Sequence, residues 1–447
     1  MRELIKIKKE WDPKSWKKFP VSQQPKWPTE KINSISNELS KFPALVPIHE
    51  IVSLKNQFKN VAKNNAFILI AGDCAETFSD FKHDLIAKKL QIIFQMSLIL
   101  GYELKKPIIK IARLAGQFAK PRSLKEETQN NITLPSYMGD AVNSIRFNKI
   151  ARTPDPKRLL KVYNQSAGTL NLLRSLTEKD IYDIINNWGF KPTSKSISKN
   201  ILNLKTIQNA INFSKTINSD GMYKHIFSKD FFTAHEALIL DYEQSLTRQD
   251  NKNKLWYDCS SHLVWLGYRT GEPDGAHVEF LSGIENPIGI KVGIKTNTKD
   301  LIEIIRKLNP DNESGKIILI LRYGENNIEE FLPSLIKQIQ SNNLNVLWIS
   351  DPMHGNTFTT KEGFKTRDFN DIIQELKSFI KILNEKNIVP SGVHFELTPE
   401  NVTECISESY NIKQSNIHEK YETACDPRLN KYQSLDISFI ITELLKG

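Results

Sequence analysis

The spacing of short apolar runs constrains the fold of this chain more than any other feature of the sequence. Eight such runs recur along the 447 residues, and most of them close on glycine or on a charged residue. They lie at 66–74, 107–116, 231–237, 262–271, 287–293, 316–324, 346–355 and 392–398. Runs of this length are typical of buried strands. Helical patterns separate several of them, and strands that alternate with helices indicate a parallel α/β fold.

A closed barrel fits this alternation better than an open sheet does. The chain contains no G-x-G-x-x-G or Walker sequence, which argues against a dinucleotide-binding or P-loop sheet. We therefore predict a (β/α)8 TIM barrel over residues 61–447, with an inserted helical pair at about 155–229. Residues 1–60 are expected to form an N-terminal extension. It would be an arm rich in Trp and Pro, anchored on this chain or on a partner subunit, followed by an amphipathic helix near 30–41.

Composition limits the class of protein. Hydrophobic residues make up 39% and charged residues 25%, as in soluble globular proteins. The longest apolar stretch is too short and too interrupted to span a membrane, and the N-terminus lacks the apolar core of a signal peptide. Four scattered cysteines favour a reducing compartment over a disulfide framework. We expect a cytoplasmic protein without a membrane partner.

The net charge of +10 raises the possibility of nucleic-acid binding. However, no zinc-finger, helix-turn-helix or RNP-like signature accompanies the basic residues, most of which are Lys spread over predicted helical faces. We therefore expect a solvated surface and no nucleic-acid partner. Arg is much rarer, and five Arg follow predicted strands or lie close to them: Arg113, Arg122, Arg269, Arg322 and Arg428. Arg binds carboxylate and phosphate in a bidentate manner that Lys cannot reproduce.

Four potential metal ligands lie at or just past the ends of predicted strands: Cys74, His354, Glu396 and Asp426. A thiolate, an imidazole and two carboxylates suit a divalent transition ion such as Mn, Fe, Co or Zn better than Ca or Mg. No local spacing such as C-x-x-C supports a site. A buried cysteine, a histidine in a turn and two capping acids therefore remain an alternative interpretation.

Six cations also lie near strand ends: Arg113, Lys120, Arg122, Arg269, Lys291 and Arg322. Gathered at one barrel mouth, they would repel one another unless anions lay between them. Charge-assisted hydrogen bonds to phosphate contribute about 1.5–3 kcal/mol each, so such a cluster predicts multiply charged ligands. Surface ion pairing is the alternative, and it fits Lys291 poorly because this residue interrupts an apolar run.

Several long motifs together resemble one family. They are GDCAETF, RLAGQFAKPRS, GAHVEFL with NPIGIKVG, DPMHGNT, GVHFELTPENVTEC and YETACDPRLN. The chain resembles the type II 3-deoxy-D-arabino-heptulosonate 7-phosphate (DAHP) synthases from the WDPKSW arm to the last helix, least closely at about 180–230. The resemblance implies a TIM barrel, a homodimer or higher homo-oligomer, and a divalent metal, Mn first, with Co, Fe or Zn as alternatives. It also implies condensation of phosphoenolpyruvate with erythrose 4-phosphate, the first step of the shikimate pathway.

The resemblance also implies roles for individual residues. Cys74, His354, Glu396 and Asp426 match the metal ligands. The residues that match the phosphoenolpyruvate site are Arg113, Tyr268, Arg269, Lys291 and Arg322. Lys120 and Arg122 match the residues that face the aldose phosphate. Lys120 is expected to protonate the developing alkoxide, so that Lys120 and Arg113 are the expected catalytic residues.

Two positions depart from the family pattern. The family usually has W-(I/V)-G-(E/D)-R-T-R where this chain has Trp265 to Gly271, so an acid is replaced by Tyr268 and a second Arg by Gly271. We interpret this as the joint loss of an ion pair, with residue 268 serving through its backbone N–H. Two other functions remain open: a related synthase that uses another aldose phosphate or an amino-sugar analogue, and a weakly active barrel with a regulatory or scaffolding role.

Overall fold

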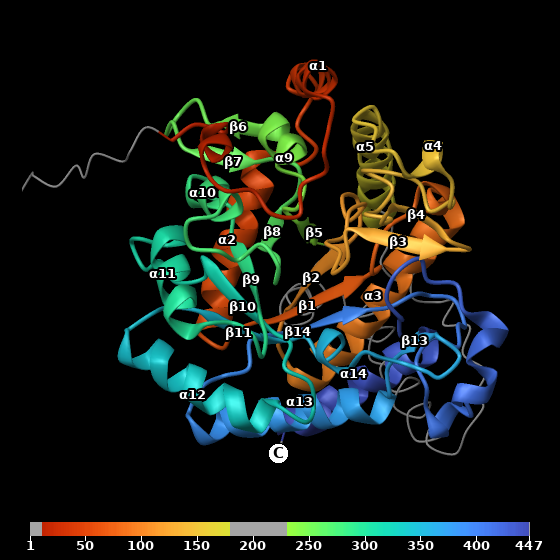
Figure 1. The fold of residues 1–447 in the computed structure, drawn as a ribbon. Helices are drawn as coiled ribbons and strands as arrows, with labels where there is room; N and C mark the ends of the chain where they lie inside the picture. The colour runs from red at the N-terminus through yellow and green to blue at the C-terminus, as the bar shows by residue number, and fades with distance from the viewer. Residues whose placement is uncertain (1–10, 179–229, 447) are drawn as a thin grey trace, which may run out of the picture.

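The computed structural model describes residues 11–178 and 230–446, and its core is a closed barrel of parallel strands (Figure 1). The order around the barrel is β1-β14-β11-β10-β9-β8-β5-β2. The bounds are β1 Phe67–Gly72, β2 Ile108–Arg113, β5 Phe231–Glu236, β8 Leu263–Leu266, β9 Ile288–Val292, β10 Ile317–Leu321, β11 Leu347–Ser350 and β14 Gly392–Glu396. Each strand coincides with one of the eight apolar runs, so the predicted (β/α)8 fold is confirmed.

Alternating side chains of these strands fill the barrel interior. Inward-facing residues such as Ile68, Ile111, Ile320 and Ile349 are fully buried and belong to one apolar cluster. The outward-facing residues of the same strands pack against the surrounding helices instead. Because side chains of a strand point alternately to its two faces, every second residue of each run faces the barrel interior. This periodicity decides which residues reach the mouth of the barrel.

Helices surround the barrel as the fold requires (Figure 1). Their bounds are α3 His83–Leu104, α9 Leu240–Leu246, α10 Ala276–Ser282, α11 Thr298–Leu308, α12 Ile328–Ser341, α13 Phe369–Glu385 and α14 Lys431–Lys446. α3 is long and apolar enough to cross a membrane by composition, but 72% of its most apolar window is buried within the protein. It packs against β1, β2 and α14, as expected of a core helix.

The N-terminal extension contributes directly to the barrel. After a short 3-10 helix (η1, Ser15–Lys18), it forms α1 (Thr29–Leu39) close to the expected helix and a second helix, α2 (Ile48–Ala62), that the sequence analysis did not predict. Leu54 and Phe58 of α2 are fully buried and join the cluster of inward-facing strand residues. α2 therefore closes the apolar interior of the barrel. The Trp-rich arm lies on this chain's own body, since Trp11 Nε1 donates to the Glu279 carbonyl at 3.0 Å.

The loops of the barrel carry further short elements. The hairpins are β3 Glu126–Gln129 with β4 Ile132–Pro135, β6 Thr247–Gln249 with β7 Trp256–Asp258, and β12 Phe358–Thr359 with β13 Lys365–Thr366. The 3-10 helices are η2 Phe78–Asp80, η3 His354–Asn356, η4 Glu408–Tyr410 and η5 Gln414–Lys420. Of the predicted insertion at about 155–229, the structure describes α5 (Arg158–Glu178), which follows the short α4 (Lys149–Arg152). Residues 179–229 lie outside the described part of the chain.

Candidate active site at the C-terminal end of the barrel

The inward face of seven of the eight strands changes from apolar to polar at or just past its C-terminal end, whereas the corresponding position after β8 is Gly267. In β2, for example, Ile109 and Ile111 fill the interior, and the next inward residue is Arg113. The same alternation places polar residues at the ends of six other strands. They are Glu236, Lys291, Arg322, Asp351, His394 and Glu396, with Cys74 two residues past Gly72 of β1. The C-terminal end of a TIM barrel is the end that carries the active site.

The four predicted metal ligands lie together at this end. The Cys74 Sγ lies 3.7 Å from Asp426 Oδ2, and His354 Nε2 lies 3.0 Å from Glu396 Oε1. Ligand atoms of Cys74, Glu396 and Asp426 all lie within 4.8 Å of one another. The expectation that all four follow strand ends was wrong for Asp426. This residue lies in the loop between η5 and α14 and is brought to β14 by the pairing of Leu397 with Leu429.

Lys120 lies among these ligands. Its ammonium group contacts Asp426 Oδ2 at 2.5 Å and Glu396 Oε1 at 3.2 Å, and it donates to the Cys74 sulfur. Although burial opposes ionisation, Lys120 helps to hold the pKa of Asp426 well below its usual range. The pKa of the Cys74 thiol is raised, mainly by burial. A cation at this position therefore meets two ionised carboxylates and one thiol.

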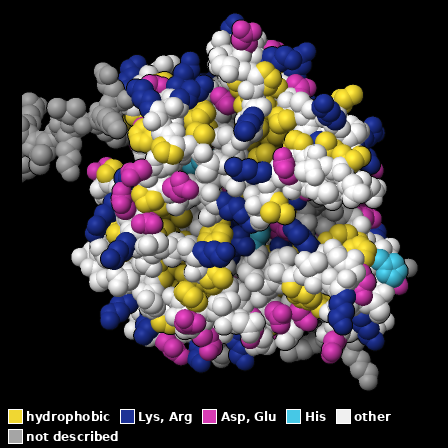
Figure 2. Space-filling view, viewed as in Figure 1, with side chains coloured by type: hydrophobic (Ala, Val, Ile, Leu, Met, Phe, Trp, Pro, Cys, Tyr) yellow, Lys and Arg dark blue, Asp and Glu magenta, His cyan; other side chains and the backbone are white. Residues whose placement is uncertain are grey.

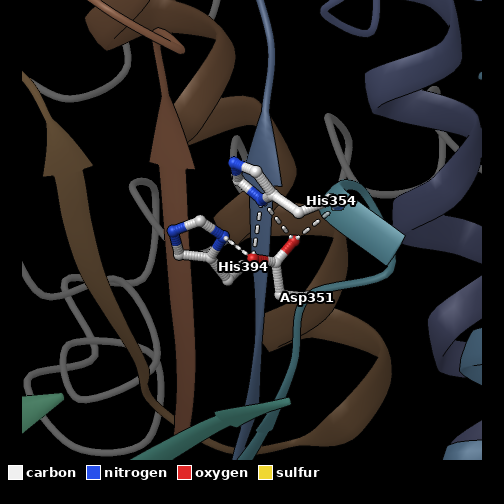
Figure 3. Close-up of side chains that lie close together, drawn as sticks. All are labelled: Asp351, His354 and His394. Atoms are coloured by element: carbon white, nitrogen blue, oxygen red, sulfur yellow. Dashed lines mark hydrogen bonds and ion pairs between the residues drawn. The ribbon is translucent and has the colours of Figure 1, made fainter. Parts of the chain in front are cut away.

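A second group of side chains orients His354 (Figure 3). Asp351 Oδ2 accepts a hydrogen bond from His354 Nδ1 at 2.8 Å, which leaves Nε2 directed at Glu396. Burial lowers the pKa of His354, favouring the neutral imidazole that can act as a metal ligand. His394 Nδ1 lies 3.4 Å from the same Asp351 carboxylate, and its Nε2 accepts from Arg113 at 2.9 Å. A carboxylate that fixes the tautomer of a ligating histidine is a common feature of metal sites.

Glu396 is held by cations on several sides. It pairs with Arg113 at 3.1 Å through Oε1 and with the fully buried Arg367 at 2.8 Å through Oε2. Burial opposes ionisation, but the charges of Lys120 and Arg367 help to hold the pKa of Glu396 well below its usual range. Arg367 also donates to the Pro427 carbonyl, next to Asp426. It thus ties the loop that carries Asp426 to the end of β14.

All six predicted cations line one cavity of about 390 Å³: Arg113, Lys120, Arg122, Arg269, Lys291 and Arg322. Figure 2 shows Lys and Arg side chains gathered near the centre of this face, with a His side chain among them. The premise that these cations need ligand anions to avoid repulsion was only partly right, because protein carboxylates lie between several of them. Lys291, for example, pairs with the buried Asp351 at 2.6 Å. Burial lowers the pKa of Lys291 to about 8.

Arg269 and Arg322 differ from the other four. Within residues 11–178 and 230–446, neither has a carboxylate within ion-pair distance. Arg269 donates to the Ser123 hydroxyl at 2.7 Å, and Arg322 donates to the His354 carbonyl at 3.1 Å. Their positive charges therefore remain available to an anion that enters the cavity.

The side chain of Tyr268 contacts Arg322 in a way that the sequence did not predict. The Arg322 guanidinium carbon lies 4.9 Å from the centroid of the Tyr268 ring. The Tyr268 hydroxyl accepts a hydrogen bond from the backbone N–H of Lys295 at 2.7 Å, which fixes the ring. Gly293 leaves room for it, since a Cβ there would lie 3.2 Å from two ring carbons. A Cβ added at Gly271 would make only ordinary van der Waals contacts, the nearest at 3.7 Å.

Arg122 is held by the β3–β4 hairpin. Its guanidinium pairs with Glu127 of β3 at 2.9 Å, and the other oxygen of Glu127 pairs with the buried Arg152 at 2.8 Å. About one quarter of the Arg122 side chain is exposed, and it lines the cavity. The ion pair with Glu127 holds the guanidinium in place.

Sequence reasoning missed four residues of this site: Glu236, Asp351, Arg367 and His394. Three of them have a signal in the sequence, because Glu236, Asp351 and His394 follow inward-facing apolar residues at the spacing of two that defines a strand face. Arg367 has none, since it lies between a short hairpin strand and α13. Arg428, noted in the sequence, pairs with Glu404 at 2.8 Å and with Asp73 at 3.1 Å and does not line the cavity.

Residues 11–442 match a family model described as the class-II DAHP synthetase family. Three curated proteins named phospho-2-dehydro-3-deoxyheptonate aldolase are similar over most of their length. The one from Streptomyces coelicolor is 41% identical over 437 residues, covering 97% of each chain. That from Neurospora crassa is 38% identical, covering 97% of this chain and 94% of its own. The enzyme from Mycolicibacterium smegmatis is 36% identical, covering 96% and 93%.

Proposed function

This chain belongs to the class-II DAHP synthetase family, and we propose on that basis how its barrel mouth performs the family's reaction. The protein catalyses the condensation of phosphoenolpyruvate with erythrose 4-phosphate and water to give DAHP and phosphate, the first step of the shikimate pathway. One observation carries the assignment of residues. Six cations line a single cavity beside a group of one thiol, one imidazole and two carboxylates.

Phosphoenolpyruvate binds, in this proposal, on the side of the cavity formed by Arg113, Lys291, Arg269 and Arg322. Arg269 and Arg322 lack carboxylate partners in the described chain, so they take the phosphate and carboxylate of the substrate. Arg113 and Lys291 already face Glu396 and Asp351, and they contribute positive potential at the floor of the site. The backbone N–H of Tyr268 completes this side, while its ring holds Arg322.

The metal ligands are Cys74, His354, Glu396 and Asp426, and the ion is a divalent transition metal, Mn first. The residues fit such an ion because they combine one soft and three harder donors, two of the donors are ionised carboxylates, and Asp351 fixes the tautomer of His354. When bound, the metal polarises the aldehyde carbonyl of the aldose phosphate as a Lewis acid.

Lys120 and Arg122 serve the second substrate. Arg122 is accessible from the cavity and binds the distal phosphate, while Glu127 keeps its guanidinium in place. Lys120 lies beside the metal ligands and donates a proton to the alkoxide that forms when C3 of phosphoenolpyruvate attacks the carbonyl carbon. Water adds at C2, and phosphate leaves by C–O cleavage.

We also propose that the enzyme is cytoplasmic and assembles as a homodimer or a higher homo-oligomer. A related synthase with another aldose phosphate or an amino-sugar analogue remains the second candidate function, since Tyr268 and Gly271 reshape the mouth between the two substrate sides. The rate of phosphoenolpyruvate consumption with a panel of aldose phosphates distinguishes the two candidate functions.

Consumption of phosphoenolpyruvate tests the proposal. Purified protein with added Mn should consume it fastest with erythrose 4-phosphate, and removal of the metal should abolish turnover. Cys74→Ser should weaken metal binding, measured by titration calorimetry, far more than it lowers the free energy of unfolding, because it removes an anionic ligand with little change in volume. Full metal occupancy and full rate in Cys74→Ser would refute the ligand assignment. Faster turnover with another aldose phosphate would favour the second candidate.

A further inference from the structure

Glu375 is a buried carboxylate on the outer side of the barrel that no step of the proposed reaction uses. It lies in α13, which packs against α12 and α14 outside the strands (Figure 1). Its side chain is fully shielded from solvent and is not among the residues that line the cavity. Burying an acid costs folding free energy unless its oxygens are hydrogen-bonded, so the partners of these oxygens indicate its role.

Both oxygens of Glu375 bind loops at the mouth of the barrel. Oε1 accepts hydrogen bonds from the backbone N–H groups of Tyr323 and Gly324, each at 3.1 Å, in the loop that follows β10. Oε2 accepts from Asn356 Nδ2 at 2.8 Å, in the 3-10 helix η3 that follows β11. One side chain on the outer helix therefore joins two neighbouring loops of the mouth.

These two loops carry one residue from each side of the proposed site. Arg322, which is assigned to phosphoenolpyruvate, directly precedes Tyr323, and His354, which is assigned to the metal, begins η3. The Arg322 guanidinium donates to the His354 carbonyl at 3.1 Å. Asn356 Oδ1 accepts from the backbone N–H of Glu325 at 2.9 Å. These contacts join the loops at further points besides the carboxylate.

Two glycines allow the backbones of the loops to touch. Gly324 has a φ of 85°, and a Cβ on it would lie 2.8 Å from the Gly355 carbonyl oxygen. A Cβ on Gly355 would lie 2.2 Å from the backbone nitrogen of Gly324. Any side chain at either position would push the loops apart. Because closely packed groups transmit displacement, a shift of one loop moves the other.

We propose that Glu375 is a positioning residue that couples the metal side of the site to the phosphoenolpyruvate side. This inference rests on the proposed function, in which His354 binds the metal and Arg322 binds phosphoenolpyruvate. A metal held by His354 restrains η3, and Asn356 and Glu375 pass that restraint to the loop of Arg322. The guanidinium is then ordered before the substrate arrives, so less conformational entropy is lost when the anion binds.

Such coupling is reciprocal. If Mn raises the affinity for phosphoenolpyruvate by a given factor, phosphoenolpyruvate raises the affinity for Mn by the same factor. Part of this factor comes from attraction between the ion and the anionic substrate, and that part does not depend on Glu375. The hydrogen bond between Glu375 and Asn356 should supply about a 2- to 12-fold share, the change in an equilibrium constant that one hydrogen bond contributes.

Glu375→Gln breaks the link between the loops selectively. Its amide oxygen can still accept the two backbone N–H groups, but its NH2 group then faces the NH2 group of Asn356. Turning the Asn356 amide over does not repair the link, because the Glu325 N–H and the Pro352 carbonyl would both lose their present partners. Asn356→Ala removes the same hydrogen bond from the other loop.

Equilibrium dialysis measures the coupling without turnover. Phosphoenolpyruvate affinity is determined in the absence of aldose phosphate, with the metal removed and with saturating Mn, and the ratio of the two dissociation constants is the coupling factor. We expect this factor to be about 2- to 12-fold smaller in Glu375→Gln and in Asn356→Ala than in the wild type. It should fall no further in the double variant, because both changes remove one link. Glu385→Gln, at the exposed end of α13, is the matched control and should keep the wild-type factor.

A purely structural role would lower stability, or both affinities, and leave the coupling factor unchanged. A wild-type factor in either folded variant, or a further loss of similar size in the double variant, would overturn the inference. If Glu375→Gln does not fold, Asn356→Ala decides the question. Independent binding of Mn and phosphoenolpyruvate by the wild type would also overturn the inference while leaving the proposed function intact. A wild type that binds neither would overturn both.

Discussion

Truncating Tyr268 to alanine should weaken phosphoenolpyruvate binding, because it removes the platform on which Arg322 rests. The guanidinium carbon of Arg322 lies 4.9 Å from the ring centroid, and the Tyr268 hydroxyl is fixed by the Lys295 backbone N–H at 2.7 Å. A cation–π contact at a partly buried site contributes about 1–2 kcal/mol. Arg322 has no carboxylate partner among the described residues, so the ring is its main source of order beside the His354 carbonyl.

This free energy converts directly into an expected change in affinity. A loss of about 1–2 kcal/mol corresponds to about a 5- to 30-fold weaker equilibrium constant. We therefore expect the KM for phosphoenolpyruvate to rise in that range in Tyr268→Ala. The KM for erythrose 4-phosphate should change less. Tyr268→Phe keeps the ring but loses the hydroxyl, and one neutral hydrogen bond is worth about 0.5–1.5 kcal/mol. Its KM should lie between those of the wild type and the alanine variant.

Steady-state kinetics at saturating erythrose 4-phosphate provides the measurement, with the loss of phosphoenolpyruvate followed continuously. If Tyr268→Ala has the wild-type KM, the ring does not hold Arg322 in a binding position. If Tyr268→Phe is as impaired as Tyr268→Ala, the hydroxyl rather than the ring is responsible. Either result would refute the reasoning from the stack.

The family pattern offers a second form of the same experiment. Tyr268→Glu alone would place a carboxylate near Arg322, which would compete with the substrate phosphate and raise the phosphoenolpyruvate KM. Gly271 has no atom within 3.7 Å of an added Cβ, so Tyr268→Glu/Gly271→Arg can introduce the missing base without a backbone clash. The double variant should lower the KM again. Equal values in both variants and the wild type would show that the two positions are not coupled.

Three further predictions concern the scaffold. Phe58→Ala should lower the free energy of unfolding by about 3–5 kcal/mol in denaturant titrations, because Phe58 of α2 is fully buried in the barrel interior; a loss below 1 kcal/mol, on the order of a surface substitution, would contradict the role of α2. Arg428→Gln should weaken Mn binding about 10- to 100-fold in calorimetry, since Arg428 ties the loop of Asp426 to Glu404 and Asp73. Unchanged Mn affinity would show that Arg428 does not position this loop. Burial raises the pKa of Glu375 to about 8 from 4.5, so the folded state binds the extra proton and wild-type stability should fall as pH rises through this window. Glu375→Gln should flatten that dependence, and parallel curves would disprove it.

The barrel was predictable from the sequence because its strands are locally distinct. Each apolar run is short, and most are closed by glycine or a charged residue, so that run 316–324 and β10 Ile317–Leu321 differ only at their ends. α2 was missed for the opposite reason. Its apolar residues, such as Leu54 and Phe58, have the spacing of an ordinary amphipathic helix, and nothing local shows that they enter the barrel rather than lie on its surface. Only the closed sheet defines the interior that they fill.

Site residues could be predicted where they follow a recognisable strand, and could not where contacts between distant parts of the chain place them. Ligands at strand ends could be proposed, since the C-terminal ends of parallel strands meet at one edge of the sheet. Asp426 was expected at a strand end that the structure does not have, because its position depends on the pairing of Leu397 with Leu429, far apart in the sequence from the other ligands. The contact of Tyr268 with Arg322 joins the loops that follow β8 and β10, two strands separated by β9, and no local pattern specifies it.

Protein carboxylates compensate four of the six cavity cations before any substrate binds. Arg367, Glu396, Arg113, His394, Asp351 and Lys291 form a continuous network of hydrogen bonds and ion pairs in which acids alternate with cations or with a neutral imidazole. Removing one partner of a buried pair costs about 3–5 kcal/mol, because the other charge remains buried without compensation. Stability therefore constrains these residues as strongly as catalysis does. Arg269 and Arg322 lie outside the network and have no carboxylate partner among the described residues, so their charges remain free to meet a substrate anion. Substitutions at these two should consequently separate function from folding, whereas substitutions within the network should impair both.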